Sequence, residues 1–98
     1  MFACVLVVDL HLPLPDSLKE KRAAIIPILE GARRRHRVAV SEVGHQDDRR
    51  RSRLAFATVG SSETQAREVL DVVERFVWSF PEIEVLEAWR RWVDDEED

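Results

Sequence analysis

Two apolar, β-branched runs with a charged connector between them constrain the fold more than any other part of the sequence. The runs are residues 38–43 and 54–59. The connector, residues 45–53, holds four arginines and two aspartates that no hydrophobic core could absorb. Two strand-like runs joined by a polar loop of this length predict a β-hairpin. One helix-period segment and then one further apolar run lie on each side, so the predicted order is β-α-β-β-α-β.

The first predicted helix follows a nearly continuous apolar run, residues 2–10, which is typical of a central strand. Ser17 and Glu20 form a capping box, in which the Ser17 hydroxyl accepts from the Glu20 N–H and the Glu20 carboxylate accepts from the Ser17 N–H. The helix is predicted to end near residue 35 or 36. Pro27 is expected on the solvent side of this helix, where it predicts a kink. The alternative is a helix that begins anew at Pro27. The predicted apolar stripe comprises Leu18, Ile25, Ile26, Ile28, Leu29 and Ala32.

The second predicted helix begins after Ser62, where Gln65 completes another capping-box pattern, although the preceding serine could cap instead. Apolar residues then recur at i, i+3, i+4 and i+7 up to Phe80, and Pro81 ends the helix.

After this helix, residues 82–85 alternate as a half-exposed strand does, and the alternation slips at Val85–Leu86, which predicts a β-bulge. Trp89 and Trp92 are open to two interpretations. They end the strand and pack against a neighbour, or they form an exposed hydrophobic patch.

This order of elements predicts an α+β, ferredoxin-like fold, the split β-α-β arrangement. Right-handed crossovers give a four-stranded antiparallel sheet in the order 4-1-3-2 with two helices on one face. We expect one such domain over residues 1–93 and a disordered acidic tail at residues 94–98. Strands one and three carry apolar residues on both faces, so the face without helices is expected to associate with a partner, most simply in a homodimer.

The net charge of −4 hides a gradient along the chain. Residues 17–53 hold eleven cations and five acids, whereas residues 54–98 hold four cations and twelve acids. The basic part suits an anionic partner, and solvation of the helices and the loop is the alternative. The lone cysteine, Cys4, excludes an intramolecular disulfide, and the N-terminal apolar run is too short for a membrane span. We therefore expect a cytoplasmic protein that does not enter a membrane.

Two segments, residues 17–22 and 41–47, resemble the signature segments of the YlxP-like family, small bacterial proteins that share a domain of unknown function, DUF503. The similarity of pattern covers roughly residues 2–88. The resemblance implies a ferredoxin-like fold, and it implies no reaction, cofactor or catalytic residue. Genes of the family often lie beside those for translation initiation and ribosome maturation factors, which suggests a ribosomal context. The chain departs from the family pattern at Pro27 and in the arginine-rich run after Asp47.

The topology brings the end of the first strand, the start of the first helix and the hairpin loop to one edge of the sheet. Cations at this edge are predicted to contact the phosphates of a nucleic acid. They are Lys19, Lys21, Arg22, Arg49, Arg50, Arg51 and Arg53. Four polar residues at the same edge are candidates for contact with a ligand or partner. They are His11, His45, Gln46 and Asp47.

Neither a metal nor a cofactor is expected. A metal site would need imidazole and carboxylate groups to converge, and no recognised ligand spacing is present among the available side chains. Those side chains are Asp9, His11, Glu42, His45 and Asp47. Cys4 lies in an apolar strand, which is typical of a small core residue and not of a nucleophile.

The sequence therefore predicts a small binding protein that associates with RNA or the ribosome through its basic edge. The first alternative is a homodimeric protein-interaction or small-ligand regulatory module that uses the apolar sheet face. An enzyme with a site near His11 and His45 is the third possibility.

Overall fold

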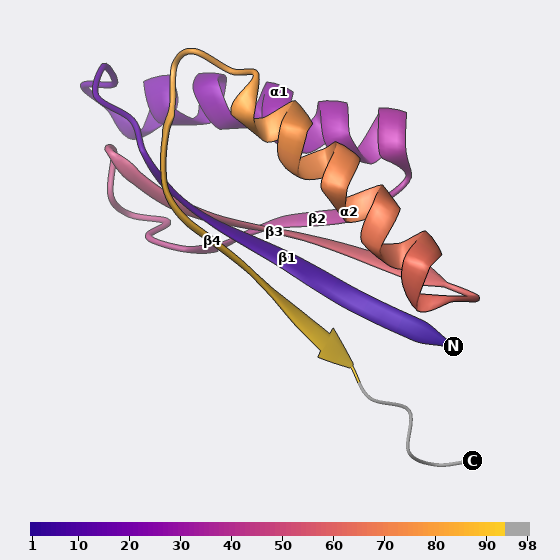
Figure 1. The fold of residues 1–98 in the computed structure, drawn as a ribbon. Coiled ribbons are helices and arrows are strands. Elements are labelled where there is room, and N and C mark those ends of the chain that lie inside the picture. The colour runs from indigo at the N-terminus through magenta and orange to yellow at the C-terminus, as the bar shows by residue number, and fades with distance from the viewer. Residues whose placement is uncertain (94–98) are drawn as a thin grey trace.

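The computed structural model of the protein describes residues 1–93. Its elements follow the predicted order β-α-β-β-α-β, and Figure 1 shows them along the chain. They are β1 (Phe2–His11), α1 (Leu18–His36), β2 (Ala39–Gly44), β3 (Arg51–Gly60), α2 (Glu63–Trp78) and β4 (Glu84–Val93). The predicted acidic tail, residues 94–98, lies outside the described residues. No helix in residues 1–93 is long and apolar enough to cross a membrane.

The four strands form one antiparallel sheet in the order β2-β3-β1-β4. Read from the other edge, this is the predicted order 4-1-3-2. Both helices cover the same face of the sheet, and no other element of the described part of the chain covers the opposite face (Figure 1). The predicted ferredoxin-like α+β fold is therefore confirmed.

The core lies between the sheet and the two helices. From Cys4 onward, side chains at even positions of β1 point to the helices and are buried, whereas most side chains at odd positions are only half-buried. Cys4 is one of the buried residues and carries a free thiol, as expected of a core cysteine. Burial raises the pKa of this thiol, which makes it a poor nucleophile. The α2 residues facing the sheet are Ala66, Leu70, Val73 and Val77.

Helix α1 begins at the predicted cap. The Ser17 hydroxyl accepts from the Glu20 N–H at 3.1 Å. The Glu20 carboxylate, however, accepts from the N–H of Asp16 at 2.6 Å and not from that of Ser17, so its expected partner was wrong by one residue. The helix continues through Pro27, which is exposed, so the alternative of a new start at Pro27 is wrong. Arg37 ends it in a left-handed conformation, φ 55°.

The buried stripe of α1 differs most from the predicted stripe at Ile26 and Lys21, and the predicted Leu18 and Leu29 are only half-buried. Ile26 is 51% exposed, whereas Lys21 is fully enclosed. Lys21 precedes Ile25 by one helical turn and Ile28 by two, so it belongs to the face that packs on the sheet. A side chain predicted to meet phosphate in solvent is therefore part of the interior.

Strand β3 begins three residues earlier than predicted, at Arg51, so the connector of the hairpin is shorter than residues 45–53. The alternation of buried and partly exposed side chains in β3 continues through this polar stretch. Ser52 points inward and is buried, and Arg53 points to the open face, where it binds Asp9. Specific polar partners, and not hydrophobicity, allow these residues to join the sheet.

Strand β4 begins at Glu84, two residues after the predicted start at residue 82, and extends through both tryptophans to Val93. Its register with β1 shifts where Glu87 pairs with Asp9 but Val85 pairs with Leu10. Leu86 is thus the extra residue of a β-bulge, as the slipped alternation predicted. The two tryptophans fall on opposite faces of the strand. The register sets Trp92 beside Cys4 on the helix face and Trp89 beside Val7 on the open face.

Candidate functional site

The hairpin loop is held against the start of α1 by the ammonium group of Lys21. Its Nζ donates to the backbone carbonyls of His45 and Asp48, each at 2.7 Å. The carboxylate of Glu42 lies 2.8 Å from the same nitrogen. Lys21 is only 1% exposed, so these acceptors replace the water that a surface lysine would have.

Glu42 connects this buried cation to the next strand. Its carboxylate also accepts from the Ser52 hydroxyl at 2.7 Å. The two segments that resemble the family signature therefore meet through Lys21 and Glu42. Their contact fixes the shape of the loop, in which His45 has a left-handed backbone, φ 58°. Lys21 has no free face to offer a phosphate.

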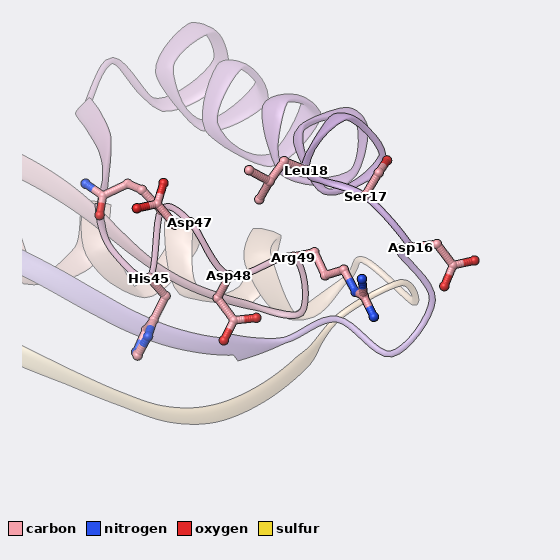
Figure 2. Close-up of a pocket in the computed structure, with 8 residues that line it drawn as sticks. Asp16, Ser17, Leu18, His45, Asp47, Asp48 and Arg49 are labelled. Carbon is pink, nitrogen blue, oxygen red and sulfur yellow. The ribbon is translucent and has the colours of Figure 1, made fainter.

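The loop and the start of α1 enclose an open depression of about 820 Å³. Figure 2 shows the lining residues, which come from both segments. They are Asp16, Ser17, Leu18, His45, Gln46, Asp47, Asp48 and Arg49. Three of the four predicted ligand or partner residues are among them, and His11 is not.

Asp48, which lines the depression, and the neighbouring Arg50 hold the loop together. The Asp48 carboxylate accepts from the Arg50 N–H at 2.8 Å, and this hydrogen bond, aided by the nearby charges of Lys21, His45 and Arg51, lowers the pKa of Asp48. The Arg50 guanidinium donates to the Pro15 carbonyl at 3.2 Å and to the Asp16 carboxylate at 3.2 Å. Arg50 therefore ties the loop to the chain that precedes α1.

His11, Asp9 and Arg53 lie on the open sheet face and not in the depression. His11 binds Glu84, its neighbour on β4. Asp9 accepts from Arg53 at 2.7 and 3.1 Å, and this hydrogen bonding lowers the pKa of Asp9. The Arg53 guanidinium also stacks over Trp89, 5.3 Å from the ring.

Three of the five side chains considered for a metal, Asp9, His11 and Glu42, are thus engaged in separate pairs. Within residues 1–93, no group of three or more histidine, cysteine, aspartate or glutamate side chains is arranged to hold a metal ion.

Three of the seven cations predicted to contact phosphate are exposed and take part in no ion pair with residues 1–93. They are Lys19, Arg22 and Arg49. Arg51 is half-buried at the start of β3, and its Nε lacks a hydrogen-bond partner among the described residues. The cations that remain available for contact with phosphate therefore lie on the outer side of the start of α1 and at the tip of the loop.

Sequence reasoning missed the part that Lys21 plays, although the signal was available. A lysine four residues before Ile25 and seven before Ile28 occupies the buried stripe of the helix. Its acid partner, Glu42, follows Val40 by two residues in β2, so both side chains lie on the strand face that the helix covers.

Comparison with known proteins gives a family and a fold. The family described as "Protein of unknown function (DUF503)" matches residues 3–90. The protein YlxP of Bacillus subtilis (strain 168), which bears the name "Uncharacterized protein YlxP", is 44% identical over 68 residues. That match covers 69% of this chain and 74% of the relative.

Two solved structures share the fold at low identity. A C-terminal segment of the alpha subunit of aIF2 from Pyrococcus abyssi superposes with a TM-score of 0.50 at 16% identity. The match covers 98% of this chain but only 52% of that segment, so the chain spans about half its length. A de novo designed protein with a ferredoxin fold also has a TM-score of 0.50, at 12% identity, with 95% and 83% of the two chains covered.

Proposed function

This chain belongs to the DUF503 family of proteins of unknown function. From that premise, we propose that it is a cytoplasmic RNA-binding protein that associates with the ribosome. The proposed contact is with RNA phosphates, at the edge where the hairpin loop meets α1. The observation that carries the proposal is the set of exposed cations at this edge, Lys19, Arg22 and Arg49, which form no ion pair within residues 1–93. The Lys21 network holds the loop rigidly beside the helix, so their spacing is fixed before binding.

The proposed contacts with phosphate position the RNA on the protein and do not select its sequence. Arginine and lysine at this edge bind phosphate oxygens without reading base sequence. Side chains of the depression, such as His45 and Gln46, lie close enough to the loop tip to meet a sugar or a base edge of the same strand. Binding of this kind weakens steeply as salt increases, because each phosphate contact releases counterions.

A salt titration with matched variants tests the proposal. The edge variant is Lys19→Gln, Arg22→Gln, Arg49→Gln. The control, Arg33→Gln, Arg34→Gln, Arg37→Gln, removes the same charge from the opposite end of α1. With a short RNA stem-loop as the probe, the edge variant should reduce the slope of log affinity against log salt by about 2 to 3, that is, by about 0.7 to 0.9 for each lost contact. The control should change the slope by less than 1.

Equal losses from both variants would mean that general charge, and not this edge, attracts RNA. Failure of the unaltered protein to bind the stem-loop at low salt would also contradict the proposal. Co-sedimentation with ribosomal particles at low salt, lost in the edge variant alone, would support the association with the ribosome.

A second candidate function uses the open face of the sheet. The observation that favours it is the half-buried apolar surface that β1 and β3 present there, including Val5, Val7, Ala55 and Ala57. Such a face suits a protein-interaction or small-ligand regulatory module. A dimeric protein that binds no stem-loop at any salt concentration would favour this candidate over the phosphate-binding edge.

A further inference from the structure

The sheet face without helices is apolar over half of its length and charged over the other half. Cross-strand register sets the residues of the apolar half side by side. They are Ala3, Val5, Val7, Ala39, Ala55, Ala57, Val59, Trp89 and Val93, and the same rows also hold the polar Ser41 on β2 and the charged Arg91 on β4. In the charged half, Asp9 pairs with Arg53, and His11 pairs with Glu84. Figure 1 shows that no element within residues 1–93 covers this face.

We infer that a second copy of the chain covers this face, through a two-fold axis that lies parallel to the strands between β1 and β3. This goes beyond the proposed RNA contact, which lies at a different part of the surface. Rotation about such an axis sets β1 against β3 of the partner and β4 against β2 of the partner. Each cross-strand row then faces the same row of the other copy, which is the arrangement of an isologous interface.

Charge complementarity favours this axis. Asp9 and Arg53 occupy one row on β1 and β3, so Asp9 faces the partner's Arg53 and Arg53 faces the partner's Asp9. The two salt bridges thereby become an alternating cluster of four charges. An axis perpendicular to the strands would instead set the charged rows against the apolar rows, where the charges would lose water without gaining a partner.

Side-chain size favours the same axis. Trp89, the largest side chain on this face, lies on β4 in the row of Val7, and Ser41 lies on β2 in that row. The proposed rotation therefore sets Trp89 over the partner's Ser41, where a small residue leaves room. Two sheets packed face to face are about 10 Å apart, so a large side chain needs a small one opposite it.

The area of this face is close to the area that each partner buries in a standard dimer interface. Ten-residue strands such as β1 and β3 span roughly 33 Å, and four strands at about 4.8 Å span roughly 19 Å. This flat footprint of roughly 600 Å² approaches the ~800 Å² of accessible surface that each partner buries in a standard interface. The chain's own acidic segment, residues 94–98, has the wrong chemistry to cover an apolar face.

The oligomeric state tests the inference directly. Val7→Arg places an unpaired charge in the centre of the proposed interface, and Val72→Arg makes the same change on the exposed side of α2. By light scattering over a range of concentrations, the unaltered protein and Val72→Arg should have twice the chain mass. Val7→Arg should dissociate at least roughly 100-fold more readily. Circular dichroism checks that both variants are folded.

Crosslinking tests the axis without placing a charge in the interface. Ala39 on β2 and Arg91 on β4 share the row of Val5, so the axis sets them opposite each other in two copies. Within one chain they lie three strand spacings apart, roughly 14 Å. A bismaleimide too short for that span should join Ala39→Cys/Arg91→Cys chains into covalent dimers. It should not join either single variant or the parent, whose Cys4 is buried.

A protein that is monomeric at all concentrations would overturn the inference, and capture of a different partner by that monomer would identify the true occupant of the face. A dimer that Val7→Arg leaves intact and Val72→Arg disrupts would also overturn it. A Val7-dependent dimer in which only single variants crosslink would contradict the axis.

Discussion

At the scale of single residues, the ammonium group of Lys21 takes the place that a bound cation has in many loops. Two loop carbonyls and the Glu42 carboxylate surround it at 2.7–2.8 Å. A buried charge of this kind is tolerated only while all its partners are present. The same lysine on the opposite side of α1 would have been an ordinary surface cation, and this difference depends on helix phase and not on composition.

Replacing Lys21 with Met is expected to destabilise the protein by about 3–5 kcal/mol, because the half-buried Glu42 would lose its counter-charge and the loop carbonyls would lose their donor. Urea unfolding measures the loss. Amide hydrogen exchange should show faster opening of residues 45–50 in particular. Lys19→Met, two residues away and exposed, is the matched control and should stay within about 0.5 kcal/mol of the parent. Equal effects of the two substitutions would show that Lys21 does not organise the loop.

The salt bridge between Asp9 and Arg53 predicts a pH dependence of stability. The hydrogen bonds from Arg53 lower the pKa of Asp9 in the folded protein. A group with a lowered folded pKa contributes its full stability above its unfolded pKa, about 3.9, and loses it as pH falls through the folded pKa. The free energy of unfolding should therefore decrease below about pH 4 and less steeply in Asp9→Asn than in the parent. Parallel pH profiles for the two proteins would remove Asp9 from the acid-sensitive groups.

At the scale of elements, the apolar periodicity of the sequence predicted the helices and strands that are held by hydrophobic packing. It did not predict a strand boundary that depends on polar partners. The apolar repeat of α2 and the Ser62 cap, which accepts from Gln65 at 3.0 Å, agree with the structure. The start of β3 could not be predicted in the same way, because Arg51, Ser52 and Arg53 have the composition of a loop. Their strand conformation depends on Glu42 and Asp9, two partners distant in sequence.

The two helices approach closely at Gly31. A Cβ added there would lie 2.5 Å from the Phe76 ring, which also packs edge-on against His36 and Phe80 and so has little room to retreat. Gly31→Ala should gain about 1 kcal/mol of helix propensity but lose about 1–3 kcal/mol to overpacking, for a net loss of up to about 2 kcal/mol. Thermal or urea unfolding measures this difference.

A second substitution separates the two contributions. Gly31→Ala with Phe76→Leu should recover stability relative to Phe76→Leu alone, since the smaller side chain leaves space for the new methyl group. Ala23→Gly, on the exposed side of the same helix, reports helix propensity alone and should cost about 1 kcal/mol. If Gly31→Ala proves stabilising by itself, the close approach of the helices does not limit this position.

At the scale of the whole molecule, the topology predicted where the candidate site lies, whereas the composition did not predict which of its side chains are free. The βαββαβ order brought the loop, the start of α1 and the end of β1 to one edge, as predicted. Which side chains are free at that edge could not be predicted, because each cation has a nearby acid in sequence or in space. Arg50 pairs with Asp16 and Arg53 with Asp9, and these choices follow from the register and from the path of the loop.

The distribution of charge over the molecule yields a last prediction. Residues 94–98 carry five of the acids, so their replacement by asparagine and glutamine changes the net charge from −4 to −4 + 5 = +1. Weaker general repulsion should tighten binding of the RNA stem-loop at low salt by up to about tenfold. The slope of log affinity against log salt should stay unchanged, because the number of phosphate contacts is unchanged. A steeper slope in this variant would mean that new contacts form, and weaker binding would mean that the acidic residues themselves contribute to recognition.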